Sequence, residues 1–295
     1  MPNRIFQSGN KGKSLATLTF TGPGQTRDID IPAPKPGHMY NDLMLVMDAT
    51  LTATTGAAVG SGANLVVDSL DLEVEKMAWP VENVRWVTMW VDGYAIAGFL
   101  PIAITTPGSG GGAAKSVIFI PCSLRPDMGR LTLRIRTGAL ATYHSTATAV
   151  SGTVKVYADE VPLGSKQNNR SIAYREKRID VLGASTDEAF DPQVVPGFGI
   201  NKAVTYKQET TGTLVDGWAD MDFILNGRYV IQPNYPFDDS QDLMRMDYRR
   251  DAAIAGVTIH DWAPEKNSAA DLFTLTNDAT ASVAQSAILF HYLEL

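Results

Sequence analysis

Residues 131–157 read LTLRIRTGALATYHSTATAVSGTVKVY, and residues 272–292 read LFTLTNDATASVAQSAILFHY. Each stretch holds an alternating strand pattern, a loop rich in small residues and a second strand pattern that closes the unit. The same series of elements therefore ends each half of the chain, and the sequence predicts one β module used twice. A repeated β module of this size favours an assembly protein over an enzyme core.

Composition sets the size and the setting of these modules. The 295 residues, 44% of them hydrophobic, can fill one large core or two cores of about 130–150 residues each. The formal net charge of -7 argues against dedicated nucleic-acid binding, so no sequence-specific nucleic-acid partner is expected. Cys122 is the only cysteine, which excludes an intramolecular disulfide. Because the sequence shows neither an apolar run of membrane-spanning length nor a signal peptide, we expect synthesis in the cytoplasm.

Most of the first half reads as strands separated by Gly, Pro, Asn and Asp. The alternation is clearest from Leu70 to Val74, where apolar and acidic residues alternate as in a strand with one buried side. The glycine-rich stretch 107–116 (PGSGGGAAKS) predicts a surface loop, because it lacks the Gly directly before Lys115 that a phosphate-binding loop requires. Strands are predicted over residues 14–20, 42–54, 66–77, 84–91 and 116–120.

The second half has the same texture, with strands predicted over residues 203–208, 212–215, 220–225, 228–232 and 257–260. Hairpin turns are predicted at Asn226-Gly227, Asp216-Gly217 and Asp92-Gly93, because type I′ turns need residues that tolerate positive φ. Residues 241–255 predict a helix capped by Ser240, with no clear counterpart in the first half. Residues 180–200 do not read as regular strand.

These patterns predict an all-β chain of two consecutive eight-stranded antiparallel jelly-roll sandwiches, with a short helix in a loop of the second. The expected divisions are a basic N-terminal arm (1–13), a first jelly roll (14–161), a polar linker with Pro and Gly (162–169) and a second jelly roll (170–295).

The residue types that carry catalysis or bind metals are scattered along the chain. Cys122 belongs to no Cys–His pattern, and the carboxylate pairs Glu73/Glu75 and Asp220/Asp222 read as solvated residues on strand exteriors. We therefore expect no enzyme activity, no cofactor and no metal site. A cation held by His260 and Asp261 together with Asp238, Asp239 and Asp242 is the alternative. No second His or Cys stands at ligand spacing from any of the four histidines, His38, His144, His260 and His291.

Two further features bear on partners. Arg4, Lys11 and Lys13 make residues 1–13 basic on an otherwise acidic chain, which suits either contact with an anionic surface, such as a genome or lipid headgroups, or a solubilising tail. Trp79, Trp86 and Trp90 lie close together in sequence, and a place in the core or in a subunit interface is favoured over a carbohydrate platform.

Two consecutive β modules, the short basic arm, the Pro-rich segment 31–37 (IPAPKPG), the small-residue loops and the single cysteine together form a recognisable set. They resemble the double jelly-roll major capsid proteins of icosahedral bacteriophages with an internal membrane, of the corticovirus and tectivirus kind. The likeness covers nearly the whole chain and rests on architecture rather than on one motif.

The resemblance implies a structural protein of the virion capsid, whose homotrimers form pseudo-hexagonal capsomers and tile an icosahedral shell over a membrane. It implies other capsid or vertex proteins as partners. It also implies that Arg4, Lys11 and Lys13 face lipid headgroups on the inner side. Loops 105–114 and 139–150 would face outward or contact neighbouring chains.

Two other classes of protein compete with this one. A trimeric phage spike or fibre, or another carbohydrate-binding β-sandwich protein, would display an exposed aromatic platform. A glycoside hydrolase on a jelly-roll scaffold would need two facing carboxylates about 5–10 Å apart in a cleft.

Overall fold

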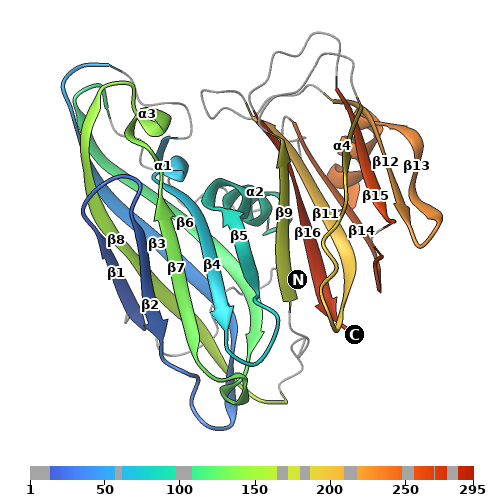
Figure 1. Cartoon of the computed structure of the whole chain (residues 1–295), viewed down its shortest axis with the longest axis horizontal. Helices are drawn as coiled ribbons and strands as arrows, with labels where there is room; N and C mark the ends of the chain where they lie inside the picture. Colours follow the sequence, from blue (N-terminus) through green and yellow to red (C-terminus); the bar gives the residue numbers. More distant parts are fainter. Residues whose placement is uncertain are drawn as a thin grey trace. The chain divides into compact units, whose positions relative to one another are not determined.

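The computed structural model describes residues 14–56, 62–97, 108–164, 172–179, 187–208, 218–247, 256–268, 270–277 and 285–295 (Figure 1). The chain divides into two compact units, Met1–Ala173 and Tyr174–Leu295. The predicted arm, the Asp216-Gly217 turn with strand 212–215, and the second part of the predicted helix lie outside the described residues.

The first unit is a sandwich in which successive strands alternate between two sheets, except that β4 and β5 pair in the same sheet. Its strands are β1 (Ala16–Phe20), β2 (Thr26–Ile31), β3 (His38–Ala53), β4 (Val67–Val74), β5 (Val81–Arg85), β6 (Gly111–Leu124), β7 (Leu131–Thr137) and β8 (Ala147–Pro162). Neighbouring strands follow the order β1-β8-β3-β6 on one side and β5-β4-β7-β2 on the other (Figure 1). The first strand pairs with the last and the second with the seventh, which is the jelly-roll arrangement.

The second unit repeats this arrangement strand for strand. It contains β9 (Ile172–Ile179), β10 (Asp187–Phe190), β11 (Phe198–Gln208), β12 (Trp218–Leu225), β13 (Arg228–Pro236), β14 (Val257–Glu265), β15 (Leu272–Asn277) and β16 (Gln285–Glu294). Its strands follow the orders β9-β16-β11-β14 and β10-β15-β12-β13. The prediction of two consecutive jelly rolls is therefore confirmed, and β10 and the start of β11 form within the stretch 180–200 that had no readable pattern.

The matching chain endings are the last two strands of each unit, β7 with β8 and β15 with β16. They are not hairpins, because the members of each pair belong to different sheets. The first Thr/Ala loop is shorter than predicted. Helix α3 (Leu140–Tyr143) forms within it, and β8 already begins at Ala147.

A second sign of duplication is a Pro-Gly turn before the third strand of each unit. His38 N–H donates to Lys35 O at 2.9 Å, and Phe198 N–H donates to Val195 O at 3.1 Å. Each turn places a glycine at positive φ, Gly37 at 76° and Gly197 at 80°, as a type II turn requires. The same glycine carbonyls accept hydrogen bonds from Leu163 N–H and Leu295 N–H, which follow the last strand of each unit.

The prediction of a strand over 84–91 is wrong beyond Arg85, because α2 (Trp86–Ala97) begins there. Asp92 and Gly93 lie inside this helix and form no hairpin turn. Helix α2 precedes β6 as α4 (Phe237–Asp247) precedes β14, so the second-half helix does have a counterpart. Within residues 86–92, the apolar Trp86, Val87, Met89 and Val91 and the polar Thr88 and Asp92 are all buried, so this part of α2 has no polar stripe with helical period for the sequence to reveal.

Helix α4 also begins earlier than predicted, so Ser240 lies within it and is not its N-cap. Pro236 ends β13, the buried Phe237 follows, and Asp238 and Asp239 occupy the first turn, where the helix dipole favours carboxylates. The first unit likewise contains short helices, α1 (Gly62–Leu65), α3 and the 3-10 turn η1 (Pro126–Met128), which the sequence did not predict.

Two local predictions are confirmed. Leu225 pairs with Arg228 across the Asn226-Gly227 turn, whose residues have φ of 52° and 73°. The apolar residues of Leu70–Val74 are buried, whereas Asp71 and Glu73 are half-buried on the opposite face. In contrast, the predicted glycine-rich loop becomes strand from Gly111 onward, because β6 pairs with β3 along this segment.

The two cores differ in character. The second unit centres on Phe223, whose ring centroid lies 5.3 Å from that of Phe273 and 6.3 Å from that of Phe290. The first unit has an aliphatic core with a buried polar chain, in which Trp86 Nε1 donates to Ser116 Oγ at 2.9 Å and Ser116 Oγ donates to Asn64 Oδ1. This chain fixes α2 and α1 against β6.

Candidate assembly surfaces

The sequence-predicted site residues Arg4, Lys11 and Lys13 lie outside the described residues. The structure shows where their segment joins the first unit. Leu15 N–H donates to Val156 O at 2.8 Å, one residue before β1 begins at the end of the β1-β8-β3-β6 order. The first described residues therefore lie beside β8.

The outer side of β2, β7 and β4 carries a charged face, defined by Asp28, Asp30, Asp71, Glu73, Arg134 and Arg136. Arg134 stands opposite Asp28 on one neighbouring strand and opposite Asp71 on the other. It also forms an ion pair with Glu73. Opposite charges across adjacent strands are favourable and keep this face solvated. Glu73 is thus an ion-pair partner and not half of an acid/base pair.

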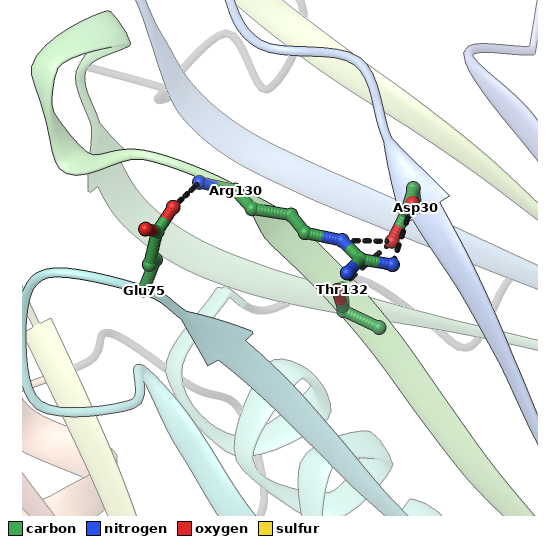
Figure 2. A network of polar contacts seen from close by, with 4 residues as sticks. All are labelled: Asp30, Glu75, Arg130 and Thr132. Atoms are coloured by element: carbon green, nitrogen blue, oxygen red, sulfur yellow. Dashed lines mark hydrogen bonds and ion pairs between the residues drawn. The ribbon is translucent and has the colours of Figure 1, made fainter.

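One end of the charged face is held by the contacts of Arg130 (Figure 2). Its Nε and Nη2 both lie 2.8 Å from the carboxylate oxygens of Asp30, and Thr132 Oγ1 donates to Asp30 at 3.0 Å. These hydrogen bonds lower the pKa of Asp30. Glu75 accepts the Arg130 backbone N–H at 3.0 Å. The bidentate pair joins the end of β2 to the start of β7, and the backbone hydrogen bond to Glu75 adds the end of β4.

Gly129 allows this corner to form. Its φ is 87°, and a Cβ there would lie 2.7 Å from Glu75 Oε2. Any other residue would be strained in the backbone and would collide with the Glu75 carboxylate.

The outer side of β3, β6 and β8 changes in polarity along the strands. It begins with an apolar band, defined by Met44, Val46, Val117, Phe119 and Tyr157. Met44 pairs with Phe119 and Tyr157, and Val46 pairs with Val117. Beyond the charged pair Asp48 and Lys115, the same side carries mainly small and hydroxyl residues. The band has the apolar and aromatic composition of a protein contact surface.

An acidic pair adjoins the apolar band. Asp42 on β3 stands opposite Asp159 on β8, which is fully buried. Burial, and next the charge of Asp159, raise the pKa of Asp42 to about 6, although Asn41 Nδ2 donates to its carboxylate at 2.8 Å. Burial and the nearby Asp42 also raise the pKa of the Cys122 thiol, which keeps it protonated and unreactive at neutral pH.

The second unit carries carboxylates on β10 and β12. Thr276 Oγ1 lies 2.9 Å from Asp187 Oδ1 and 2.6 Å from Asp220 Oδ1. Burial and these two neighbouring charges raise the pKa of Asp222. Within the described ranges, no group of three His, Cys, Asp or Glu side chains is arranged to hold a metal ion.

Two of the tryptophans belong to the core rather than to a carbohydrate platform. Trp86 is fully buried, and Trp218 is 5% exposed beneath Lys207 Nζ, which lies 4.7 Å from its ring centroid. Two histidines are likewise structural. His144 Nδ1 accepts the Thr146 N–H, so its Nε2 donates to Gly108 O at 3.1 Å. His291 packs edge-on against Tyr174 at 4.7 Å.

No helix among the described residues is long and apolar enough to cross a membrane. No protein-family model matches the chain, and no curated relative matches its sequence.

Solved structures show where this architecture recurs. The chain is similar to the major capsid protein of Sulfolobus Turreted Icosahedral Virus, with a TM-score of 0.68 and 14% identity over 95% of this chain and 97% of that chain. The capsid of PBCV-1 virus matches with a TM-score of 0.60 and 8% identity, covering 97% of this chain and 96% of that one. The Faustovirus major capsid protein matches at 0.52 and 7%, over 99% and 92%. The chain therefore has the double jelly-roll fold of these viral major capsid proteins.

Replacing Asp42 by Asn is expected to stabilise the first unit at neutral and higher pH. The folded-state pKa of about 6 exceeds the ordinary 3.8, so protonation of Asp42 favours folding fully below pH 3.8, and this contribution is lost as pH rises through 6. At higher pH the buried charge destabilises the native protein by on the order of 1–3 kcal/mol, which Asn avoids. In urea unfolding, the Asp42→Asn variant should have a larger free energy of unfolding than the native protein at about pH 8. At about pH 4 the two free energies should be equal.

Asp48→Asn is the matched control, because Asp48 lies on the same strand but is exposed. The difference in free energy of unfolding between Asp48→Asn and the native protein should be the same at both pH values. An equal gap between Asp42→Asn and the native protein at both pH values would contradict the buried titration.

Proposed function

We infer that the chain is a structural major capsid protein that assembles with copies of itself in the virion capsid. The observation that carries this inference is the end-to-end match: both jelly rolls in one chain correspond to nearly the full length of a viral major capsid protein. The matched proteins are structural components of capsids and not enzymes. At 14% identity, a shared fold supports a shared architecture, and the assembly role is tested by the oligomeric state.

The surfaces support a structural role. The carboxylate pair Glu73/Glu75 is engaged in structural contacts, Glu73 in an ion pair with Arg134 and Glu75 in a hydrogen bond with the Arg130 N–H. Of the three tryptophans close together in sequence, Trp86 is fully buried and Trp79 and Trp90 are half-buried, so none of them is the fully exposed ring that a carbohydrate-binding spike or fibre would display. A chain with only 19% charged residues suits a protein that buries much of its surface between copies.

The finer features are proposals by resemblance. Three chains would form a pseudo-hexagonal capsomer, and capsomers would tile an icosahedral bacteriophage shell with other capsid or vertex proteins. The α3 segment and the neighbouring start of β8 would face outward or contact adjacent chains. Residues 1–13 would lie on the inner side, where Arg4, Lys11 and Lys13 would contact the headgroups of an internal membrane.

Light scattering coupled to size exclusion should give the mass of a trimer, about 96 kDa for chains of 31.9 kDa. Electron microscopy of concentrated protein should show hexagonal arrays or closed shells. A monomer that persists at high concentration and binds glycans on an array would contradict the capsid assignment and favour the carbohydrate-binding class.

The membrane assignment has a separate test. Flotation with anionic liposomes should recover the full chain, and deletion of residues 1–13 should abolish recovery at about 0.15 M salt, because each basic residue near an anionic surface contributes about 1 kcal/mol. The charge-neutral variant Arg4→Gln/Lys11→Gln/Lys13→Gln separates charge from length and should fail to float as well. Equal flotation of all three proteins would remove the membrane contact.

A further inference from the structure

In residues 237–243, helix α4 of the second unit buries one face against the sandwich. Phe237 is 1% exposed, Ser240 fully buried and Gln241 7% exposed, at the spacing of one helical turn. Residues between and beyond them, including Asp239 and Leu243, are exposed. Within residues 237–243, the buried side chains that pack α4 against the sandwich are therefore Phe237, Ser240 and Gln241.

The polar half of this attachment centres on His260 in β14. Ser240 Oγ lies 2.7 Å from His260 Nε2, and the same nitrogen lies 3.0 Å from Met221 Sδ in β12. Gln241 Nε2 adds a hydrogen bond to Val257 O at 3.3 Å. A helix, a strand of one sheet and a strand of the other thus meet at one imidazole.

The matching helix of the first unit is attached differently. Trp86 Nε1 in α2 donates to Ser116 Oγ in β6, which donates in turn to Asn64 Oδ1. Both helices precede the same strand of their jelly roll and both use a side-chain hydrogen bond to reach it. None of the three groups in the first unit titrates between pH 4 and 8, whereas histidine does.

We propose that the Ser240–His260 contact is an acid-released latch: protonation of His260 frees α4 from β14 while α2 of the first unit stays in place. The inference does not rest on the capsid assignment, because it concerns one contact within the second unit.

The surroundings of His260 oppose its protonation. Burial lowers its pKa to about 4, and the charge of Asp261, which is itself paired with Lys202 Nζ at 3.1 Å, raises it only in part. The His260 ring meets the Tyr235 ring of β13 edge to face, with the ring centroids 6.3 Å apart. Further charged residues on the described parts of the packed elements are Asp238, Asp239 and Asp242 of α4, Asp220 and Asp222 of β12, Lys207 of β11, Arg228 of β13 and Glu265 of β14. A charged imidazole would lose its solvation, and the two described partners of Nε2, Ser240 Oγ and Met221 Sδ, carry no compensating negative charge.

The direction of the pH effect follows. The latched pKa of about 4 lies below the ordinary 6.5 that His260 regains when α4 opens, so the latch is intact above pH 6.5 and weakens as pH falls toward 4. From these two values, opening of α4 should be about 20-fold more frequent at pH 5 than at pH 7.

Hydrogen exchange of the intact chain measures this opening. After correction for intrinsic exchange rates, amides of 237–247 should lose about 20-fold protection between pH 7 and pH 5, and amides of 86–97 should keep theirs. His260→Gln keeps a hydrogen-bonding side chain without titrating and should remove the pH dependence of α4. His291→Gln, in the same unit, is the matched control and should retain it.

The proposal is overturned if α4 protection is the same at both pH values, if α2 opens in parallel, or if His260→Gln keeps the native response. If His260→Gln does not fold, an NMR titration of the imidazole C–H resonances of His260 in the native protein tests the proposal. Titration near pH 4 supports the latch, and titration near pH 6.5 contradicts it.

Discussion

Pairing between the first and last strands closes each unit, and the rest of the structure depends on it. In the first unit, β1 pairs with β8 from Ala16 and Val156 to Phe20 and Gly152. Closing a chain segment of this length costs on the order of 4 kcal/mol in loop entropy. Burial of Leu18 and Phe20, at about 2 kcal/mol each, offsets that cost. Once β8 is in place it pairs with β3 along nearly its whole length, and β3 positions β6.

The same closure occurs in the second unit, where β16 lies between β9 and β11. Duplication therefore extends beyond strand order to the Pro-Gly turns at Gly37 and Gly197 and to a helix before β6 and β14. The copies have diverged in polarity and charge. The first unit presents alternating charges on β2, β7 and β4, whereas the second collects Asp187, Asp220 and Asp222 on its equivalent sheet. Two copies of one fold thus offer different surfaces, as a protein needs if each copy contacts different neighbours.

The sequence predicted the parts of the fold that have a local signal. The Asn226-Gly227 turn and the alternation from Leu70 to Val74 are such signals, and both are confirmed. Helix α2 was missed because Trp86, Val87, Met89 and Val91 are all buried, so tertiary burial overrode their strand propensity and removed any helical stripe. The Asp42–Asp159 pair and the Ser240–His260 contact were invisible because their members are far apart in sequence. The repeated Pro-Gly pairs were a readable signal that went unused.

Disulfide crosslinking of equivalent strands tests the duplicated jelly roll most directly. Thr26 stands opposite Arg136 between β2 and β7, and Asp187 stands opposite Thr276 between β10 and β15. Cysteine pairs at these positions should each crosslink under mild oxidation, with little background from Cys122, which is 1% exposed. A pair at Arg136 and Ser151, on consecutive strands of different sheets, should not crosslink. Arg136 and Ser151 would face each other only if β7 and β8 formed a hairpin. Crosslinking of this pair, together with no crosslinking of either of the other two pairs, would contradict the duplicated jelly roll.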